Sequence, residues 1–303
     1  MTARNSDAGA LQDQYRDLAE FSRKNEGVWH AGALHDGLPV DVLALAPALA
    51  AKIALPEGFL AALAHGASHK LRGVSRPISW GRTAGGGFHC AYPRDADPAS
   101  VAPGVKPAGE VAVAGSFLAR ALSSVHHAGM VHGAVSTSRI LHAADGGLQL
   151  GVFALYPALV AGGVDRRDAV MLLSDVAYVS PEGRAGAPLD ARSDVYSLGA
   201  AMYELITGKP PFGGRTTSYV MASVLSEDDG ASAAVSARAS SHVIEAVLRA
   251  IERAPDDRWP SAAAFAAALE VGTASGHDPD DEDGRSLLAI FKEAWFPARR
   301  SRE

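Results

Sequence analysis

Short hydrophobic segments alternate with turns over the first third of the chain and predict strands. An Asp-Gly turn at Asp36 and Gly37 separates the first two segments, which is typical of a hairpin. Between the second and the third, residues 56–70 carry a helical pattern that begins with a proline. The predicted strands are residues 27–29, 40–45, 72–81 and 88–92.

From about residue 107 onward the hydrophobic spacing becomes helical. In the first of these segments, apolar residues recur at intervals of three or four positions. The predicted helices are residues 111–127, 194–208, 241–254 and 261–270. A small strand-rich lobe therefore precedes a larger helical lobe, and the sequence predicts an α+β, bilobal fold with a cleft between the lobes.

The same patterns predict where the parts of the chain begin and end. Five acidic residues between Asp278 and Asp283 indicate a solvated linker rather than a folded element. The expected parts are a flexible N-terminus (1–12), an N-lobe (13–92), a C-lobe (93–271), an acidic linker (272–285), and a C-terminal amphipathic helix with a basic tail (286–303).

Composition narrows the possible environments and partners. The 303 residues carry a formal net charge of −6, so no overall positive field favours nucleic acid. The single cysteine, Cys90, is expected to be a small buried hydrophobic residue in a reducing compartment. No segment predicts a secretory signal or a membrane span. These observations predict a cytoplasmic protein.

Three motifs in the second half of the chain together indicate a family. They are the triplet Ser180-Pro181-Glu182, the segment 190–199 (DARSDVYSLG) and the segment 254–261 (APDDRWPS). In order and spacing they resemble the C-lobe of the bacterial-type Ser/Thr protein kinases, within the protein kinase-like superfamily. The resemblance is close over about residues 111–270 and loose over 13–92. It implies a bilobal protein kinase-like fold with a diverged N-lobe.

The resemblance also assigns structural roles to four residues of this sequence. It implies a buried ion pair between Glu182 and Arg258. It places Asp194 at the start of the central helix, where it would accept hydrogen bonds from the backbone of the catalytic loop. His132 takes the position of the histidine at the start of that loop.

The resemblance places different residue types at the positions that carry kinase chemistry. Phosphoryl transfer requires a base, ligands for Mg²⁺ and a lysine on the phosphates. Ala134 stands at the position of the base, and Arg139 and Val152 stand at the two metal-binding positions. Leu43 takes the place of the phosphate-binding lysine, and Ser136 takes that of the catalytic-loop lysine. A methyl group accepts no proton, and a guanidinium repels a metal cation.

These replacements predict a degenerate member of the family, a pseudokinase that is not an enzyme. On this hypothesis the chain needs no cofactor, and ATP with Mg²⁺ is not an expected ligand. No metal site is predicted elsewhere, since the spacing of the histidines near residue 130 is not that of a zinc motif.

Three functions remain open on the sequence. The first is a scaffold or allosteric regulator that binds another protein in signalling. The second is an enzyme, or a binder of a nucleotide or other small ligand, that uses the cleft through non-standard residues. The third is a structural component of a larger assembly.

The C-terminal segment offers a candidate partner-binding surface. Its apolar residues share one helical face, which would either pack on the chain's own lobe or dock into a groove of a partner. The residues expected to make that contact are Leu287, Leu288, Phe291 and Trp295.

Overall fold

The computed structural model describes residue 11 and residues 13–83, 85–94, 106–143, 147–211 and 233–274. For residues 233–241 and 272–274 the description is limited to the backbone. The predicted flexible N-terminus lies almost wholly outside the described residues. The acidic linker beyond residue 274 and the C-terminal helix, with its four candidate docking residues, lie outside them as well.

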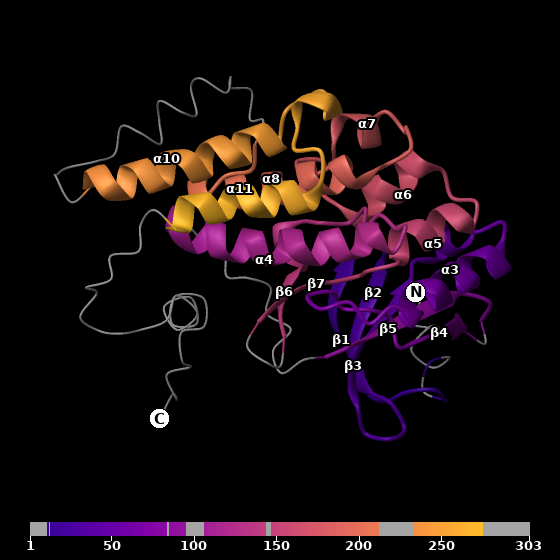
Figure 1. Ribbon diagram of the computed structural model, residues 1–303. Helices are drawn as coiled ribbons and strands as arrows, with labels where there is room; N and C mark the ends of the chain where they lie inside the picture. The colour runs from indigo at the N-terminus through magenta and orange to yellow at the C-terminus, as the bar shows by residue number, and fades with distance from the viewer. Residues whose placement is uncertain are drawn as a thin grey trace, which may run out of the picture.

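The described part of the N-lobe forms a five-stranded antiparallel sheet in the order β1-β2-β3-β5-β4 (Figure 1). Its strands are β1 (Arg16–Lys24), β2 (Gly27–Ala33), β3 (Pro39–Leu45), β4 (Ser79–Arg82) and β5 (Phe88–Pro93). The sequence did not predict β1, because this edge strand is exposed along most of its length and lacks hydrophobic alternation. The strand predicted over 72–81 is shorter than expected, and only its end pairs with β5.

Helix α3 (Pro56–Ser68) of the N-lobe packs against helix α5 (Leu155–Ala161) of the C-lobe. It begins at a proline, as the sequence predicted, and follows the short helix α2 (Pro47–Ala50). The backbones of α3 and α5 approach closely. A Cβ built on Gly66 would lie 2.2 Å from the Cβ of Ala154, so this contact requires a glycine.

The C-lobe consists mainly of helices. Helices α4, α10 and α11 lie side by side, and α8 packs behind them (Figure 1). Their bounds are α4 (Ala108–His127), α8 (Ala191–Thr207), α10 (Ala233–Ala250) and α11 (Ala262–Ala274), and the smaller elements are α6 (Arg166–Leu173), α7 (Pro181–Arg184), the 3₁₀ turns η1 (Thr137–Arg139) and η2 (Pro255–Asp257), and the pair β6 (Ile140–His142) and β7 (Leu148–Leu150).

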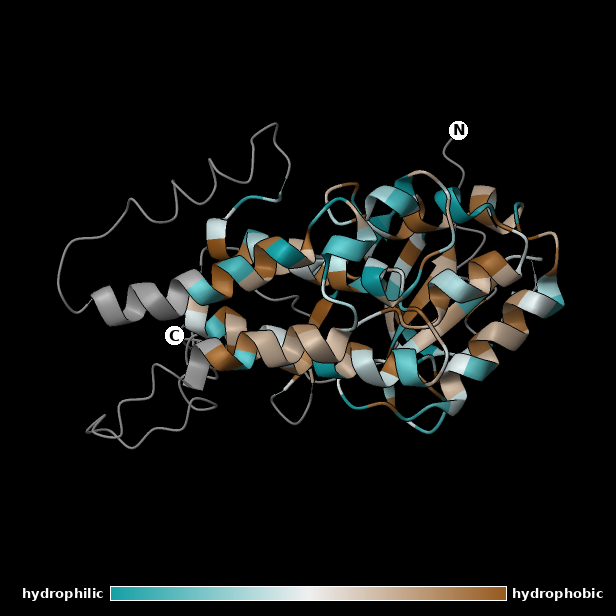
Figure 2. Cartoon of the chain, turned by 45° about the horizontal axis from the view of Figure 1, so that its top comes forward, coloured by the Kyte–Doolittle hydropathy of each residue, from teal (hydrophilic) through white to brown (hydrophobic). Residues whose placement is uncertain are grey.

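Local signals explain why the central helix α8 forms where it does. Asp190 and Ser193 make a reciprocal capping box at its start. Gly208 ends it in the left-handed conformation, with a φ of 73°. Hydrophobic and hydrophilic residues alternate along the helices (Figure 2), and their apolar faces form the core of the C-lobe.

A second hydrophobic core spans both lobes. It joins Leu43 of the sheet and Phe59 of α3 to Phe153 and Leu155 near the start of α5. Because this core is continuous, the N-lobe and the segment 152–173 are packed together.

Candidate functional site

A buried aspartate fixes the loop at the floor of the cleft. The Asp194 carboxylate, at the start of α8, accepts hydrogen bonds from the backbone N–H groups of His132 and Gly133, both at 2.8 Å. The His126 ring contributes a third hydrogen bond at 2.8 Å. Burial alone would raise the pKa of Asp194, but the hydrogen bond from His126 and the neighbouring groups hold it below its ordinary value. The loop is thus held by a charged carboxylate.

His132 is packed in the core and does not face solvent. Its ring lies 5.9 Å from that of Phe153, centroid to centroid. Burial lowers the pKa of His132 to about 4, and Asp194 only partly opposes this shift. The imidazole is therefore neutral near pH 7.

The two residues after His132 are also confined. Gly133 has a φ of 67°, and a Cβ built on it would lie 2.4 Å from the ring of Tyr156. Ala134 is fully buried. A side chain at position 133 would collide with Tyr156 of α5, and the complete burial of Ala134 suits a small residue there as well.

A second carboxylate, which pairs with a fully buried arginine, ties the C-lobe together. The Arg258 guanidinium donates to both carboxylate oxygens of Glu182, at 2.8 and 2.9 Å, and it lies over the ring of Tyr196. Burial would raise the pKa of Glu182, but the Arg258 pair and a hydrogen bond from Ser193 lower it to about 2. This is the pairing that the family resemblance implied.

Arg139 reaches across the cleft from η1. Its side chain is 6% exposed and pairs with Glu26, with Nη2 2.6 Å from Oε1. The same guanidinium donates to the Leu173 carbonyl oxygen, at 2.9 Å from Nη2. The indole N–H of Trp29 also donates to Glu26, at 3.2 Å. Glu26 belongs to the turn between β1 and β2, so this ion pair joins the two lobes.

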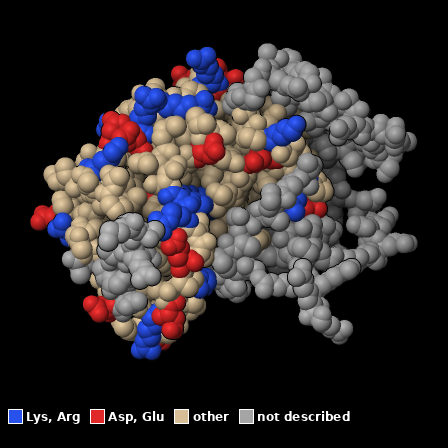
Figure 3. Space-filling model, turned by 180° about the vertical axis from the view of Figure 1, so that it is seen from behind, with Lys and Arg blue, Asp and Glu red and all other residues tan. Residues whose placement is uncertain are grey.

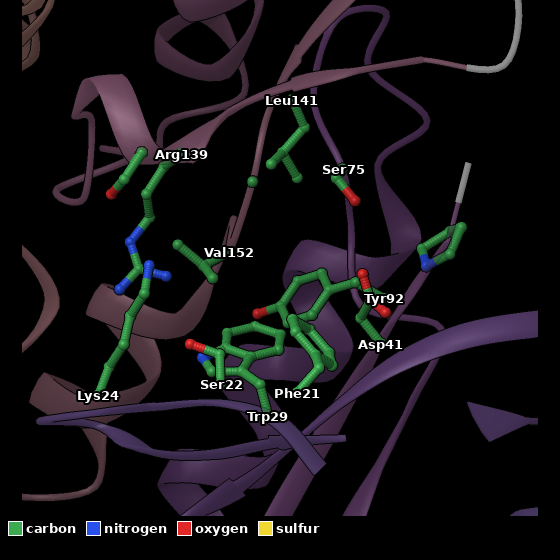
Figure 4. A pocket seen from close by; sticks show the side chains of 13 residues that line it. Phe21, Ser22, Lys24, Trp29, Asp41, Ser75, Tyr92, Arg139, Leu141 and Val152 are labelled. Carbon is green, nitrogen blue, oxygen red and sulfur yellow. The ribbon is translucent and has the colours of Figure 1, made fainter. Parts of the chain in front are cut away.

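A pocket of about 350 Å³ opens beside this ion pair. Aromatic rings form one side of it, and the Lys24 and Arg139 side chains end together on another (Figure 4). Further walls come from both lobes. The residues that line the pocket are Phe21, Ser22, Lys24, Trp29, Asp41, Ser75, Tyr92, Pro93, Ser138, Arg139, Leu141, Gly151 and Val152.

The structure separates the five residues that the resemblance placed at catalytic positions. Only Arg139 and Val152 line the pocket. Leu43 is fully buried in the core that spans the lobes, and Ala134 is buried behind the loop. Ser136 is also buried, and its hydroxyl lies 3.3 Å from that of Ser138.

The pocket does not fit a Mg²⁺ ion. Hard divalent cations require several oxygen ligands, above all carboxylates. Among the residues that line the pocket, Asp41 is the one carboxylate, and the Arg94 guanidinium holds it at 2.6 Å. Arg139 adds a positive charge to the wall. No group of three or more metal-ligating side chains occurs within the described residues.

A comparison with models of known protein families identifies the family of this chain. The model of the protein kinase domain matches residues 104–268, just over half of the chain. The chain belongs to the protein kinase family. The match covers the C-lobe, where Asp194 and the Glu182–Arg258 pair lie.

Curated relatives of this kinase-family chain are bacterial Ser/Thr kinases. A probable serine/threonine-protein kinase of Corynebacterium efficiens is 35% identical over 155 residues, which is 50% of this chain and 24% of that protein. PknB of Mycobacterium tuberculosis is 32% identical over 176 residues, 56% of this chain and 28% of that protein. PknL of the same species is 36% identical over 150 residues, 50% of this chain and 37% of that protein. The chain thus spans about a quarter to a third of these relatives.

Solved structures confirm the predicted α+β, bilobal fold. The crystal structure of the Mycobacterium tuberculosis PknI kinase domain superimposes with a TM-score of 0.63 and 19% identity. The match covers 86% of this chain and 97% of that domain. This likeness extends over the N-lobe, which the family model does not match.

These comparisons contradict one prediction from the sequence. The prediction that the chain is not an enzyme is wrong by this standard, because the matched family is the protein kinase domain and the relatives are named serine/threonine-protein kinases. That prediction rested on the replacement of five residues at positions that carry catalysis in the family. The comparisons point to an enzyme.

Sequence reasoning missed the residues that shape the pocket on the N-lobe side. Lys24 and Trp29 line the pocket and Glu26 pairs with Arg139 beside it, but no pattern in the sequence marked these three residues as part of a site.

Arg166 and Arg167 lie in the exposed first turn of α6, where Asp165 accepts hydrogen bonds from the backbone N–H groups of Arg167 and Asp168. Basic and acidic side chains are interspersed over the described part of the face in Figure 3. None of the described helices combines the length and the apolar character needed to cross a membrane.

Proposed function

We propose that this member of the protein kinase family is a degenerate, cytoplasmic signalling domain that acts as an allosteric regulator by binding another protein. In this proposal Leu43, Ala134, Arg139 and Val152 stand at the family's lysine, base and metal positions. ATP with Mg²⁺ is then not its ligand. A reaction in the cleft would need groups other than carboxylates at positions 134 and 152.

The observation that carries the proposal is the Glu26–Arg139 ion pair. Both side chains are almost fully buried and both belong to the cleft. The pair connects the turn after β1 with η1 and, through the Leu173 carbonyl, with the end of α6. Because this contact joins three segments around the cleft, a conformational change in one segment would alter the position of the others, as allosteric regulation requires.

Partner binding through the C-terminal segment is the part of this proposal that a mutation tests most simply. The tagged full chain and its Phe291→Ala/Trp295→Ala variant would be used to capture proteins from the native host, with quantitative mass spectrometry. We expect a reproducible partner that the wild-type chain enriches and the double variant loses. Equal recovery by both chains, with both folded by circular dichroism, would contradict docking by this segment.

A second candidate function has its own support. The pocket between the lobes is built from non-standard residues yet remains open beside Lys24 and Arg139. Its volume lies within the range of small-molecule sites. We therefore also propose a small-ligand site in the cleft, which would serve a regulator or an enzyme.

A further inference from the structure

Aromatic side chains form one wall of the pocket between the lobes. Trp29 and Tyr92 form one continuous group, with ring centroids 6.1 Å apart. The Phe21 ring lies beside them and is 49% exposed, so it covers the pocket from the solvent side (Figure 4). Aliphatic side chains of Leu141 and Val152 face these rings from the C-lobe. Such a surface suits a planar apolar group.

The polar end of the pocket carries more positive than negative charge. Two carboxylates of the N-lobe are already engaged: Glu26 pairs with Arg139 at 2.6 Å, and Asp41, on the opposite side of the pocket, pairs with Arg94 at 2.6 Å. Among the described residues, no carboxylate lies within ion-pair distance of the Lys24 ammonium. Among the described residues of the pocket wall, Lys24 is thus a cation without a carboxylate in an ion pair with it.

The position of Lys24 makes its charge costly without a counterion. Partial burial and the adjacent Arg139 guanidinium lower the pKa of Lys24, and Glu26 opposes this only in part. An anionic group beside the ammonium would relieve the repulsion from Arg139. The wall is therefore complementary to a negative charge.

From this juxtaposition we infer that the pocket binds a small planar aromatic compound that carries a single anionic group, without a metal ion. The ring system would lie between Trp29 and the aliphatic wall, and the anionic group would meet Lys24 and the outer edge of Arg139. The inference deepens the second candidate function and rests on it.

The charge balance favours one anionic group over a triphosphate. One unbalanced ammonium, next to a guanidinium that Glu26 already neutralises, matches one negative charge. A triphosphate would bring several charges into a wall that holds no metal ligands to share them. The inferred ligand class therefore differs from nucleotide triphosphates bound through Mg²⁺.

Two compounds with the same ring system separate the contribution of charge from that of the aromatic surface. Binding of 2-naphthoate and of neutral 2-naphthamide to the full chain would be measured by isothermal titration calorimetry, in EDTA and in Mg²⁺. We expect 2-naphthoate to bind about tenfold more tightly than the amide, since a charge-assisted hydrogen bond is roughly twice as strong as a neutral one. Mg²⁺ should leave both affinities unchanged.

Three variants locate the charge. Lys24→Gln should bring the affinity of 2-naphthoate down to that of the amide, and Lys24→Arg should restore most of the difference. Arg23→Gln is the matched control, because Arg23 neighbours Lys24 on β1 but pairs with Glu20 and does not line the pocket. It should bind both compounds as the wild-type chain does.

Each other outcome overturns a definite part of the inference. Equal binding of acid and amide, or an equal loss in Arg23→Gln and Lys24→Gln, would leave a ligand pocket but refute the anionic group. Tighter binding of ATP than of 2-naphthoate in EDTA would refute the single-charge class. No binding of either naphthalene compound would refute the ligand-site candidate itself.

Discussion

At the scale of single residues, two carboxylate–arginine pairs of the C-lobe differ above all in burial. Arg258 is fully buried against Glu182, whereas Arg120 is 63% exposed where it pairs with Glu270. Both arginines hold both oxygens of their carboxylate. The pairs therefore allow a buried arginine to be compared with an exposed one.

We predict that Glu182→Gln is far more destabilising than Glu270→Gln. Removal of the Glu182 charge leaves Arg258 buried and unbalanced, which should cost about 3–5 kcal/mol in the free energy of unfolding. Loss of the exposed pair should cost at most about 1 kcal/mol. Urea denaturation at pH 7 measures both. Equal losses would contradict the role given to burial.

The same pair predicts a dependence on pH. The pKa of Glu182 is lowered to about 2 in the fold, so its contribution is present above the ordinary value of 4.5 and is lost as the pH falls toward 2. The stability difference between the wild-type chain and Glu182→Gln should therefore shrink between pH 5 and pH 3. A constant difference over that range would show that the pairing with Arg258 does not lower the pKa of Glu182.

His89 predicts a second, separate pH effect. It is fully buried, and burial lowers its pKa to about 4 from an ordinary 6.5. The unfolded chain thus binds a proton that the folded chain excludes, and stability should fall by roughly 2 kcal/mol between pH 7 and pH 5 from this group. His89→Phe should remove that part of the slope in urea denaturation. An unchanged slope would mean that His89 is charged in the fold.

At the scale of elements, the contact between α3 and α5 is set by glycine. A Cβ on Gly66 would lie 2.2 Å from the Cβ of Ala154, whereas a Cβ on Gly109, in the first turn of α4, would meet nothing within 4 Å. Ala is the better helix former at both positions. The two glycines thus differ only in what surrounds them.

We predict opposite effects when each glycine is replaced by alanine. Gly66→Ala should lower stability by about 1–3 kcal/mol, because the helices must move apart. Gly109→Ala should leave stability unchanged or raise it by up to about 1 kcal/mol. Thermal unfolding of both variants checks this. A stable Gly66→Ala chain would contradict the close packing of α3 on α5.

The elements also show what the sequence could predict. Helices α3, α4 and α8 were expected because each is long and carries an apolar face, and Pro56 also marked the start of α3. The exposed strand β1 has no periodic apolar pattern, and α5, α6 and α7 are too short to show one. The pairing of Glu26 with Arg139 spans 113 residues of sequence, and no local pattern predicts such a contact.

At the scale of the whole molecule, the two lobes are joined by a continuous core and by the Glu26–Arg139 ion pair. The family resemblance gives Arg139 the place of a metal ligand, and in the structure its guanidinium forms an ion pair with Glu26. We therefore predict that the cleft binds its ligand without Mg²⁺.

We predict that Glu26→Gln weakens the connection between the lobes, because it leaves a buried arginine without its partner. The loss should be about 3–5 kcal/mol, and Glu26→Gln/Arg139→Met should recover much of it. Glu20→Gln, which removes an exposed partner of Arg23 on the preceding strand, should have almost no effect. Urea denaturation of the three variants provides the comparison. No recovery in the double variant would contradict direct pairing.

Calorimetric titration of the full chain with ATP, in excess Mg²⁺ and again in EDTA, shows whether the cleft needs a metal ion to bind its ligand. We predict the same affinity, or the same lack of binding, in both conditions, because the pocket wall offers Arg139 and Val152 and one engaged carboxylate. Binding of ATP that appears only with Mg²⁺ would contradict this account.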